Sequence, residues 1–278
     1  VRSQLRPYPE SDPRYVPTLE QEIERIKALS QSDLQSLYEN FIGGSVGEIA
    51  VVGDFSEDEV YAQLGSMLDD WKSPAPYKHI PAEPHAIPGK LTEIIIPDKA
   101  NAFYFGGLTF PMNSNSPEYP DLIVAGSVLG SSGLSSRLGD RVRQKEGLAY
   151  GVGAFIHADN VDSRGSISLY ASCNPDNMEK VETAIKEELA LLISKGITAE
   201  ELANAQKGYL EQQEVSRTSD SSLASILATN LFANRDMTYY SELETKVNAV
   251  TADAARQAFA KYIDPANLII TVSGSLKQ

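Results

Sequence analysis

Four basic side chains fall within nine residues near the middle of this sequence, in a chain whose formal net charge is −14. They are Arg137, Arg141, Arg143 and Lys145, and they follow a glycine- and serine-rich turn that begins at Gly130. Tyr150 lies seven residues after Arg143, where an apolar run begins. A basic cluster in so acidic a protein is a candidate functional surface, and the Arg143–Tyr150 spacing is its most distinctive feature.

Nucleophilic chemistry has little support in this sequence. The turn contains four serines, Ser131, Ser132, Ser135 and Ser136, but no Gly-x-Ser-x-Gly frame surrounds them and no histidine is near in sequence. We therefore expect these serines to cap helices. The single cysteine, Cys173, rules out an intrachain disulfide and is expected to be a small buried residue at the end of a strand.

The three histidines do not form a metal motif. His79 and His85 lie in a proline-rich stretch, and neither they nor His157 have the four-residue spacing that places two ligands on one helix face. We therefore expect no metal or other cofactor to be bound by this chain alone.

Composition limits the other function classes. The chain has 278 residues, of which 42% are hydrophobic and 22% charged, as in ordinary globular proteins. Its pI of about 4.7 argues against non-specific binding to nucleic acid or to anionic lipid. The sequence contains no run of about 18 apolar residues, so we expect no membrane insertion.

The N-terminal quarter is expected to be mostly helical. After a polar arm, apolar periodicity predicts helices over 19–29 and 30–42, the second with a Ser30–Asp33 capping box. A buried strand is predicted over 49–52 and a helix over 56–68. Five prolines between residues 73 and 89 then indicate a stiff, extended linker.

The rest of the chain has the pattern of an α+β fold with a mostly antiparallel sheet packed against helices. Strands are predicted over 91–96, 102–110, 148–158, 165–172 and 268–272, with the third and fourth forming an antiparallel pair. Helices are predicted over 117–129, 174–194, 198–217, 223–232, 243–250 and 251–263. The aromatic strand 103–107 is read as core, with strand addition of an extended substrate at a free edge as the alternative.

The two ends of the chain repeat each other. With an offset of 221 residues, Leu29 falls on Val250 and Ile49 on Ile270 without a gap, so helix, turn and strand recur in the same order. We therefore interpret residues 1–72 as the C-terminal tail of a preceding homologous repeat and residues 73–90 as a linker. Residues 91–278 are interpreted as one complete C-terminal domain, and the chain as a piece of a longer protein.

Two blocks carry a family resemblance: Gly133-Leu-Ser-Ser-Arg-Leu138, and Arg143-x-Lys-Glu-Gly-Leu-Ala-Tyr150. They resemble the C-terminal domain signature of the pitrilysin, insulin-degrading-enzyme and mitochondrial-processing-peptidase family of zinc peptidases, the inverzincins. The ending Val51-Val-Gly-Asp54 and its acidic helix are also similar to the close of a domain in that family. The resemblance implies homologous α+β domains that enclose a peptide-binding chamber, with a His-x-x-Glu-His zinc motif on the first domain.

That resemblance implies a role for two residues. Arg143 would bind a substrate carbonyl, and Tyr150 would donate a hydrogen bond to it or to the developing oxyanion. The alternative is that neither residue contacts substrate, Arg143 being a surface arginine and Tyr150 a half-buried tyrosine. Arg137 and Arg141 are expected to form ion pairs, and the carboxylates at 69–70 and 200–201 to be solvated helix faces.

The sequence departs from the family at the metal, since neither His-x-x-Glu-His nor His-Glu-x-x-His occurs in it. We therefore expect a non-catalytic part of a zinc peptidase, inactive alone, with zinc in a missing or partner catalytic domain. The expected partners are a peptide substrate and a homologous catalytic domain, in cis or in trans, and a homodimer is kept as a further assembly. An inactive peptidase-like scaffold or assembly subunit is the alternative. The periplasm and the cytoplasm of a bacterium are both compatible with the sequence.

Overall fold

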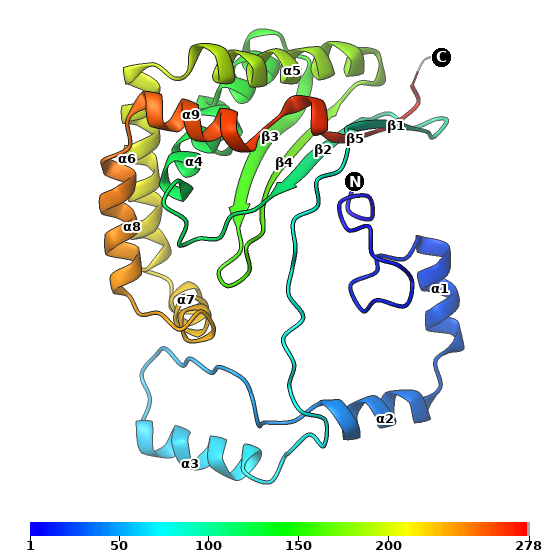
Figure 1. The fold of residues 1–278 in the computed structure, drawn as a ribbon, viewed down its shortest axis with the longest axis vertical. Coiled ribbons are helices and arrows are strands. Elements are labelled where there is room, and N and C mark those ends of the chain that lie inside the picture. Colours follow the sequence, from blue (N-terminus) through cyan, green and yellow to red (C-terminus); the bar gives the residue numbers. More distant parts are fainter. Residues whose placement is uncertain (277–278) are drawn as a thin grey trace. The chain divides into compact units, whose positions relative to one another are not determined.

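The computed structural model describes residues 1–276, and the chain divides into two compact units (Figure 1). Unit 1 consists of Val1–Tyr8, Ala82–Gln213 and the chain from Tyr240 on. Unit 2 consists of Pro9–Pro81 and Glu214–Tyr239. The basic cluster and Tyr150 belong to unit 1, so this unit positions the candidate site.

One mixed five-stranded sheet organises unit 1, with the strand order β1-β5-β2-β4-β3. The strands are β1 (Lys90–Ile95), β2 (Ala102–Phe110), β3 (Ala149–Ala158), β4 (Gly165–Cys173) and β5 (Ile269–Gly274). Only β1 and β5 are parallel, and the other neighbours are antiparallel. The predicted α+β class, the five strands of unit 1 and the β3–β4 pair are confirmed.

The alternative reading of residues 103–107 as a free edge is wrong, because β2 lies between β5 and β4. Its Phe105 pairs with Thr271 on one side and with Tyr170 on the other. The C-terminal strand β5 inserts between β1 and β2. The order of the strands along the sequence does not reveal this insertion. The edges of the sheet are β1 and β3.

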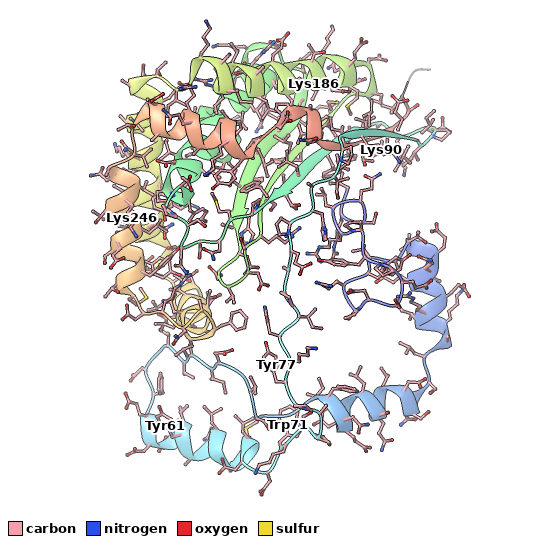
Figure 2. All side chains as sticks on the ribbon, viewed as in Figure 1. Tyr61, Trp71, Tyr77, Lys90, Lys186 and Lys246 are labelled. Carbon is pink, nitrogen blue, oxygen red and sulfur yellow. The ribbon has the colours of Figure 1, made fainter. Side chains whose placement is uncertain are left out.

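Two helices pack on the sheet, α4 (Tyr119–Gly126) and α5 (Met178–Lys195), and a third, α9 (Ala252–Tyr262), packs against both of them (Figure 1). The caps explain where they begin and end. The Thr251 hydroxyl accepts a hydrogen bond from the amide of Ala254, and Gly196, with φ +73°, ends α5. Lys186 on α5 and Lys90 at the start of β1 are labelled in Figure 2. Among the described residues, no helix is both long and apolar enough to cross a bilayer.

Two further helices, α6 (Ala199–Ser216) and α8 (Thr238–Asn248), connect α5 to α9. The Gln206 side chain of α6 donates hydrogen bonds to the carbonyls of Val247, Asn248 and Val250, where α8 ends. The helices predicted over 174–194, 198–217, 243–250 and 251–263 are confirmed, although α8 begins earlier than expected.

Unit 2 contains helices but, within the described chain, no strand. Its helices are α1 (Leu19–Ala28), α2 (Gln31–Phe41), α3 (Glu57–Leu68) and α7 (Asp220–Phe232). Full capping boxes begin α1 at Thr18 and α2 at Ser30, as predicted for the second. None of the residues of α1, α2 or α3 is buried, and Tyr61 of α3, visible in Figure 2, is largely exposed.

The predicted buried strand over 49–52 is wrong. These residues have no regular structure, and Ile49 and Val51 are exposed. A strand forms only when another strand takes up its backbone hydrogen bonds. Unit 2 offers no such strand among its described residues, so the apolar run at 49–52 does not form one.

The helix and the closing glycine of the repeat seen in the sequence recur in the backbone, whereas its strand does not. Shifting α2 by 221 residues gives the bounds of α9, Ala252–Tyr262. The glycines after the two apolar segments, Gly53 and Gly274, have φ values of +148° and +145°. Both positions therefore use a backbone conformation that favours glycine.

Candidate functional site

The basic cluster lies on a stretch of irregular helix. The predicted helix over 117–129 is regular only in α4, and continues as a π-helix, η1 (Ser127–Ser131). A short 3₁₀ turn follows, and then a second π-helix, η3 (Gly139–Lys145), that carries three of the four basic residues. π-Helical segments are rare and occur frequently at functional sites.

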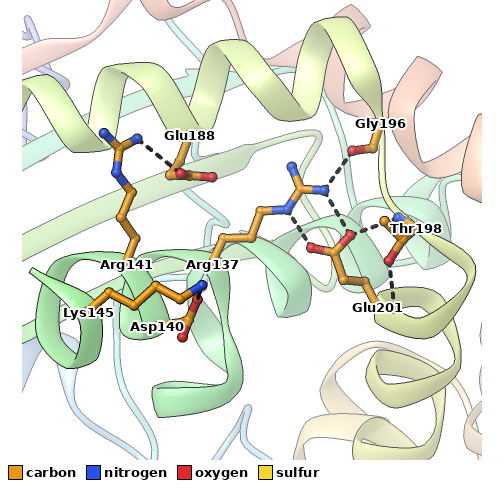
Figure 3. Close-up of polar contacts among 8 residues, drawn as sticks. All are labelled: Arg137, Asp140, Arg141, Lys145, Glu188, Gly196, Thr198 and Glu201. Atoms are coloured by element: carbon orange, nitrogen blue, oxygen red, sulfur yellow. Dashed lines mark hydrogen bonds and ion pairs between the residues drawn. The ribbon is translucent and has the colours of Figure 1, made fainter.

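Arg137 has the least exposed side chain of the paired cations in the cluster, and it pairs with Glu201 (Figure 3). Its Nε lies 2.6 Å from Oε1 of Glu201 and its Nη2 lies 2.8 Å from Oε2, while Nη2 also donates to the carbonyl of Gly196. The Arg137 hydrogen bonds lower the pKa of Glu201 to about 2, aided by the amide of Thr198. Arg137 therefore fastens the turn before η3 to the start of α6.

Arg141 and Lys145 are neutralised in the same way. Arg141 pairs with Glu146, 2.8 Å from its Nε, and with Glu187 and Glu188 of α5. Hydrogen bonding to Glu146 is the main cause that raises the pKa of Arg141. Lys145 pairs with Asp140 at 2.6 Å (Figure 3). The ion pairs predicted for Arg137 and Arg141 are confirmed.

Arg143 is the exception within the cluster. It is exposed, and its guanidinium has no hydrogen bond or ion pair with any residue from 1 to 276. Its neighbours at 141 and 145 use the nearby carboxylates. Arg143 is thus the one cation of the cluster available to bind another molecule.

Tyr150 lies at a β-bulge. Ala149 pairs with Cys173 and Gly151 with Ser172, so Tyr150 is the extra residue of β3. Bulges re-aim side chains and are common beside active sites. The Tyr150 side chain is 61% exposed, and its hydroxyl has no hydrogen-bond partner in the described part of the chain.

A short loop joins the two elements that carry Arg143 and Tyr150. The amide of Leu148 donates to the carbonyl of Val142 at 2.8 Å, which closes the loop. Gly147, with φ +60°, makes this reversal, a conformation that favours glycine. The end of η3 and the start of β3 are thereby brought together, each with an exposed polar side chain that has no partner among residues 1–276.

The serines have structural roles. The Ser136 side chain is buried, donates to the carbonyl of Gly133 and accepts from the amide of Gly139. Ser135 donates to the carbonyl of Ser132, and the hydroxyls of Ser127 and Ser132 bond each other. These bonds hold the turn before η3, but the capping prediction is largely wrong, because η1, η2 and η3 have no side-chain cap and, of these serines, only Ser136 accepts from a backbone amide of the described chain.

The other candidate residues add no chemistry. Cys173 is buried at the end of β4, and burial raises the pKa of its thiol to about 11. Among residues 1–276, no three His, Cys, Asp or Glu side chains form a group that could hold a metal ion. The residues present therefore do not fit a zinc ion.

One expectation about a surface carboxylate is wrong. A solvated helix face is predicted for Glu200 and Glu201, but Glu201 binds Arg137. The capping box predicted from Thr198 to Glu201 is confirmed. The Thr-x-x-Glu pattern indicates the cap, whereas the arginine lies 64 residues away in sequence and cannot be identified from spacing.

Comparison with known proteins agrees with this reading. The sequence model of the peptidase M16 inactive domain matches residues 28–209. The uncharacterized zinc protease YmxG of Bacillus subtilis is 33% identical over 160 residues, covering 56% of this chain and 38% of that protein. A relative in Helicobacter pylori, called a non-peptidase homolog, is 25% identical over 67% of this chain and covers 42% of that protein.

Solved structures show the same fold. A crystal structure of a peptidase M16 inactive domain from Pseudomonas fluorescens superposes with a TM-score of 0.74 at 19% identity, over 92% of this chain and 61% of the other. The chain spans about two fifths of the length of the curated relatives that it matches. On the match of the family model, the chain belongs to the peptidase M16 inactive-domain family.

Proposed function

We propose that this chain is the non-catalytic part of a zinc metallopeptidase and that unit 1 forms one wall of its peptide-binding chamber. Arg143 and Tyr150 are the residues that we assign to the substrate. The observation that carries this assignment is the contrast within the basic cluster. Three cations are neutralised by carboxylates, whereas Arg143 has no partner among residues 1–276.

The two side chains suit a carbonyl that gains negative charge. A guanidinium and a phenol can both donate hydrogen bonds to such an oxygen. Donors aimed at a developing oxyanion are worth about 2.7–4 kcal/mol each in an enclosed site. The irregular backbone at η3 and at the bulge sets the backbone positions from which the Arg143 and Tyr150 side chains extend.

In this proposal the zinc ion is bound by another domain and not by this chain. The acidic and histidine side chains of the described chain are not grouped for zinc. A homologous catalytic domain, in cis or in trans, would supply it, and the chain alone would not cleave peptides. The named zinc protease relatives, which are longer than this chain, support that arrangement.

Substitution in the catalytic assembly tests the assignment. We expect Arg143→Ala and Tyr150→Phe each to lower kcat/KM for peptide cleavage by roughly 100- to 1,000-fold, with bound zinc unchanged. Lys145→Ala is the matched control, because it removes an exposed cation from the same helix that is already paired with Asp140. Unchanged turnover in both test variants would remove the proposed role.

We also propose that residues 1–72 are the tail of a preceding homologous unit, that residues 73–90 are a linker and that residues 91–278 form the complete domain. Burial at equivalent positions supports this. Ile263 after α9 is fully buried, whereas its equivalent Ile42 after α2 is 41% exposed. Ile270 of β5 is 6% exposed and its equivalent Ile49 is 51% exposed. Residues 1–72 therefore have the apolar residues of a core but lack the packed elements that would cover them.

A pair of equivalent truncations tests this organisation. In the 278-residue chain, Ile263→Ala should cost about 2–5 kcal/mol of unfolding free energy and Ile42→Ala less than about 1 kcal/mol. In a protein that carries the upstream unit, both should cost about 2–5 kcal/mol. An Ile42→Ala cost that stays small there would refute the preceding unit.

A catalytically inactive scaffold or assembly subunit is the second candidate. The relative in Helicobacter pylori that is called a non-peptidase homolog supports it. The discriminating observation is a His-x-x-Glu-His motif in the upstream sequence or in a partner chain. With such a motif present, bound zinc and peptide cleavage are expected; with neither, the scaffold is favoured.

A further inference from the structure

A second exposed region of unit 1 is the face of the sheet opposite its helices. Along β2, alternate residues Phe103 and Phe105 are exposed, while Ala102 and Tyr104 are buried. Phe105 pairs with Tyr170 of β4. This open face therefore carries aromatic side chains where a solvated sheet face is usually polar.

The aromatic side chains form a flat platform. Tyr170 pairs with Gly153 of β3, and a Cβ added to Gly153 would lie 2.7 Å from Cε1 of Tyr170, so the ring lies directly against the glycine. The ring of Phe155 is parallel to that of Tyr170, with centroids 6.0 Å apart and an interplanar angle of 6°. The glycine thus lets the tyrosine lie flat on the sheet.

The N-terminal segment Val1–Tyr8, which belongs to unit 1, lies on the same face. A Cβ added to Gly107 would lie 3.2 Å from Leu5, and the Gln4 amide donates to the Thr92 hydroxyl at 3.2 Å. Between this segment and the platform is a groove of about 670 Å³. Its polar lining includes Ser166 and Ser168.

Three arginines line the groove: Arg2, Arg6 and Arg164. In the part of the chain that the structure describes, their guanidinium groups have no hydrogen bond or ion pair, whereas Arg14, Arg25, Arg137, Arg141 and Arg256 each pair with a carboxylate. Such a concentration of unneutralised positive charge stands out in a chain of net charge −14.

Two of these arginines, Arg6 and Arg164, repel each other. Burial is the main cause that lowers the pKa of Arg164, and the positive charge of Arg6 lowers it further. Asp159 acts on Arg164 in the opposite direction, but its Oδ1 accepts from the amides of Val161 and Asp162. The groove is therefore an environment that an anionic group would stabilise.

We propose that this groove binds an extended peptide segment with acidic side chains. The carboxylates would pair with the arginines, and an apolar or aromatic side chain between them would lie on the Phe155–Tyr170 platform. This inference rests on the proposed peptide-binding role and specifies the substrate class that unit 1 selects. Single-stranded nucleic acid also binds arginines and aromatic faces, but the net charge of the chain disfavours a polyanion.

Fluorescence anisotropy with the 278-residue chain tests the proposal. The probes are a fluorescein-labelled peptide with two glutamates on each side of a Leu-Phe pair, its glutamine counterpart, and a labelled uridine oligonucleotide. We expect the glutamate peptide to bind at least about tenfold more tightly than the glutamine peptide at low salt, and the difference to shrink at high salt.

Two substitutions locate the site. Arg164→Gln and Arg6→Gln should each reduce the preference for glutamate at least about threefold. Arg256→Gln should leave it unchanged, because that arginine is on α9 and pairs with Asp253. Circular dichroism of each variant checks folding, and two independent arginines keep the test decisive if one variant unfolds.

The outcomes are distinct. Equal binding of both peptides, no binding of either, tighter binding of the oligonucleotide, or an unchanged preference in both groove variants would overturn the proposal. Lys145→Ala should retain the preference for glutamate, since Lys145 pairs with Asp140 and does not line the groove. Failure of the Arg143–Tyr150 assignment would leave this binding intact, so the two proposals fail separately.

Discussion

The ion pair between Arg137 and Glu201 gives the sharpest prediction about stability. Glu201→Gln keeps the size of the side chain and one acceptor oxygen, but it removes the charge that binds Arg137 through two nitrogens. Glu200→Gln is the matched control, because Glu200 is the exposed neighbour on the same helix. The two variants change the same residue type and the same net charge.

The magnitude follows from the lowered pKa. A carboxyl with an ordinary pKa of 4.5 that is held at about 2 gains at most about 3 kcal/mol. Because the pair is partly in contact with solvent, we expect Glu201→Gln to cost about 1–2 kcal/mol at pH 7. That corresponds to a fall of about 2–8 °C in the melting transition of unit 1.

The pH dependence has a defined sign. The pKa of Glu201 is lower in the folded protein, so its contribution is complete above pH 4.5 and is lost as the pH falls through about 2. Thermal unfolding by circular dichroism at pH 7, 4 and 2.5 should show a difference between wild type and Glu201→Gln that shrinks with acidity. No difference at pH 7, or an equal effect of Glu200→Gln, would refute this reasoning.

Two further predictions concern unit 1. Gly153→Ala should cost about 1–3 kcal/mol of unfolding free energy in chemical denaturation, because the added Cβ would force Tyr170 to move. At Gly151 the nearest ring atom would be 3.7 Å from an added Cβ, so alanine there should cost less than about 1 kcal/mol. Equal costs would contradict the packing. Cys173 should react with Ellman's reagent more than roughly 100-fold faster in denaturant than in the native protein, given its burial and a thiol pKa of about 11, and rapid native reaction would contradict it.

Much of unit 1 could be predicted from local sequence. Capping residues such as Ser30 and Thr251 define helix starts, and Gly196 defines the end of α5. Apolar alternation identified all five strands of the sheet. These signals are local, so they do not disclose that β5 inserts between β1 and β2. For the same reason, a strand pattern at 49–52 carries no information on whether a neighbouring strand is present.

The sequence predicts part of the candidate site as well. The basic cluster and the separation of Arg143 from its neighbours' ion pairs follow from composition and family resemblance. The partners do not, because Glu187 and Glu188 lie more than 40 residues from Arg141 and meet it only when α5 packs beside η3. The bulge at Tyr150 and the charged groove on the open face likewise depend on sheet register, which the sequence leaves open.

The central claim is that Arg143 and Tyr150 contact the substrate. It is tested most directly by a structure of the catalytic assembly with a bound, uncleaved peptide. We predict a guanidinium nitrogen of Arg143 and the phenol oxygen of Tyr150 within about 3.2 Å of a peptide carbonyl oxygen. A complex in which both side chains remain in solvent, or pair with carboxylates of the protein instead, would contradict the account.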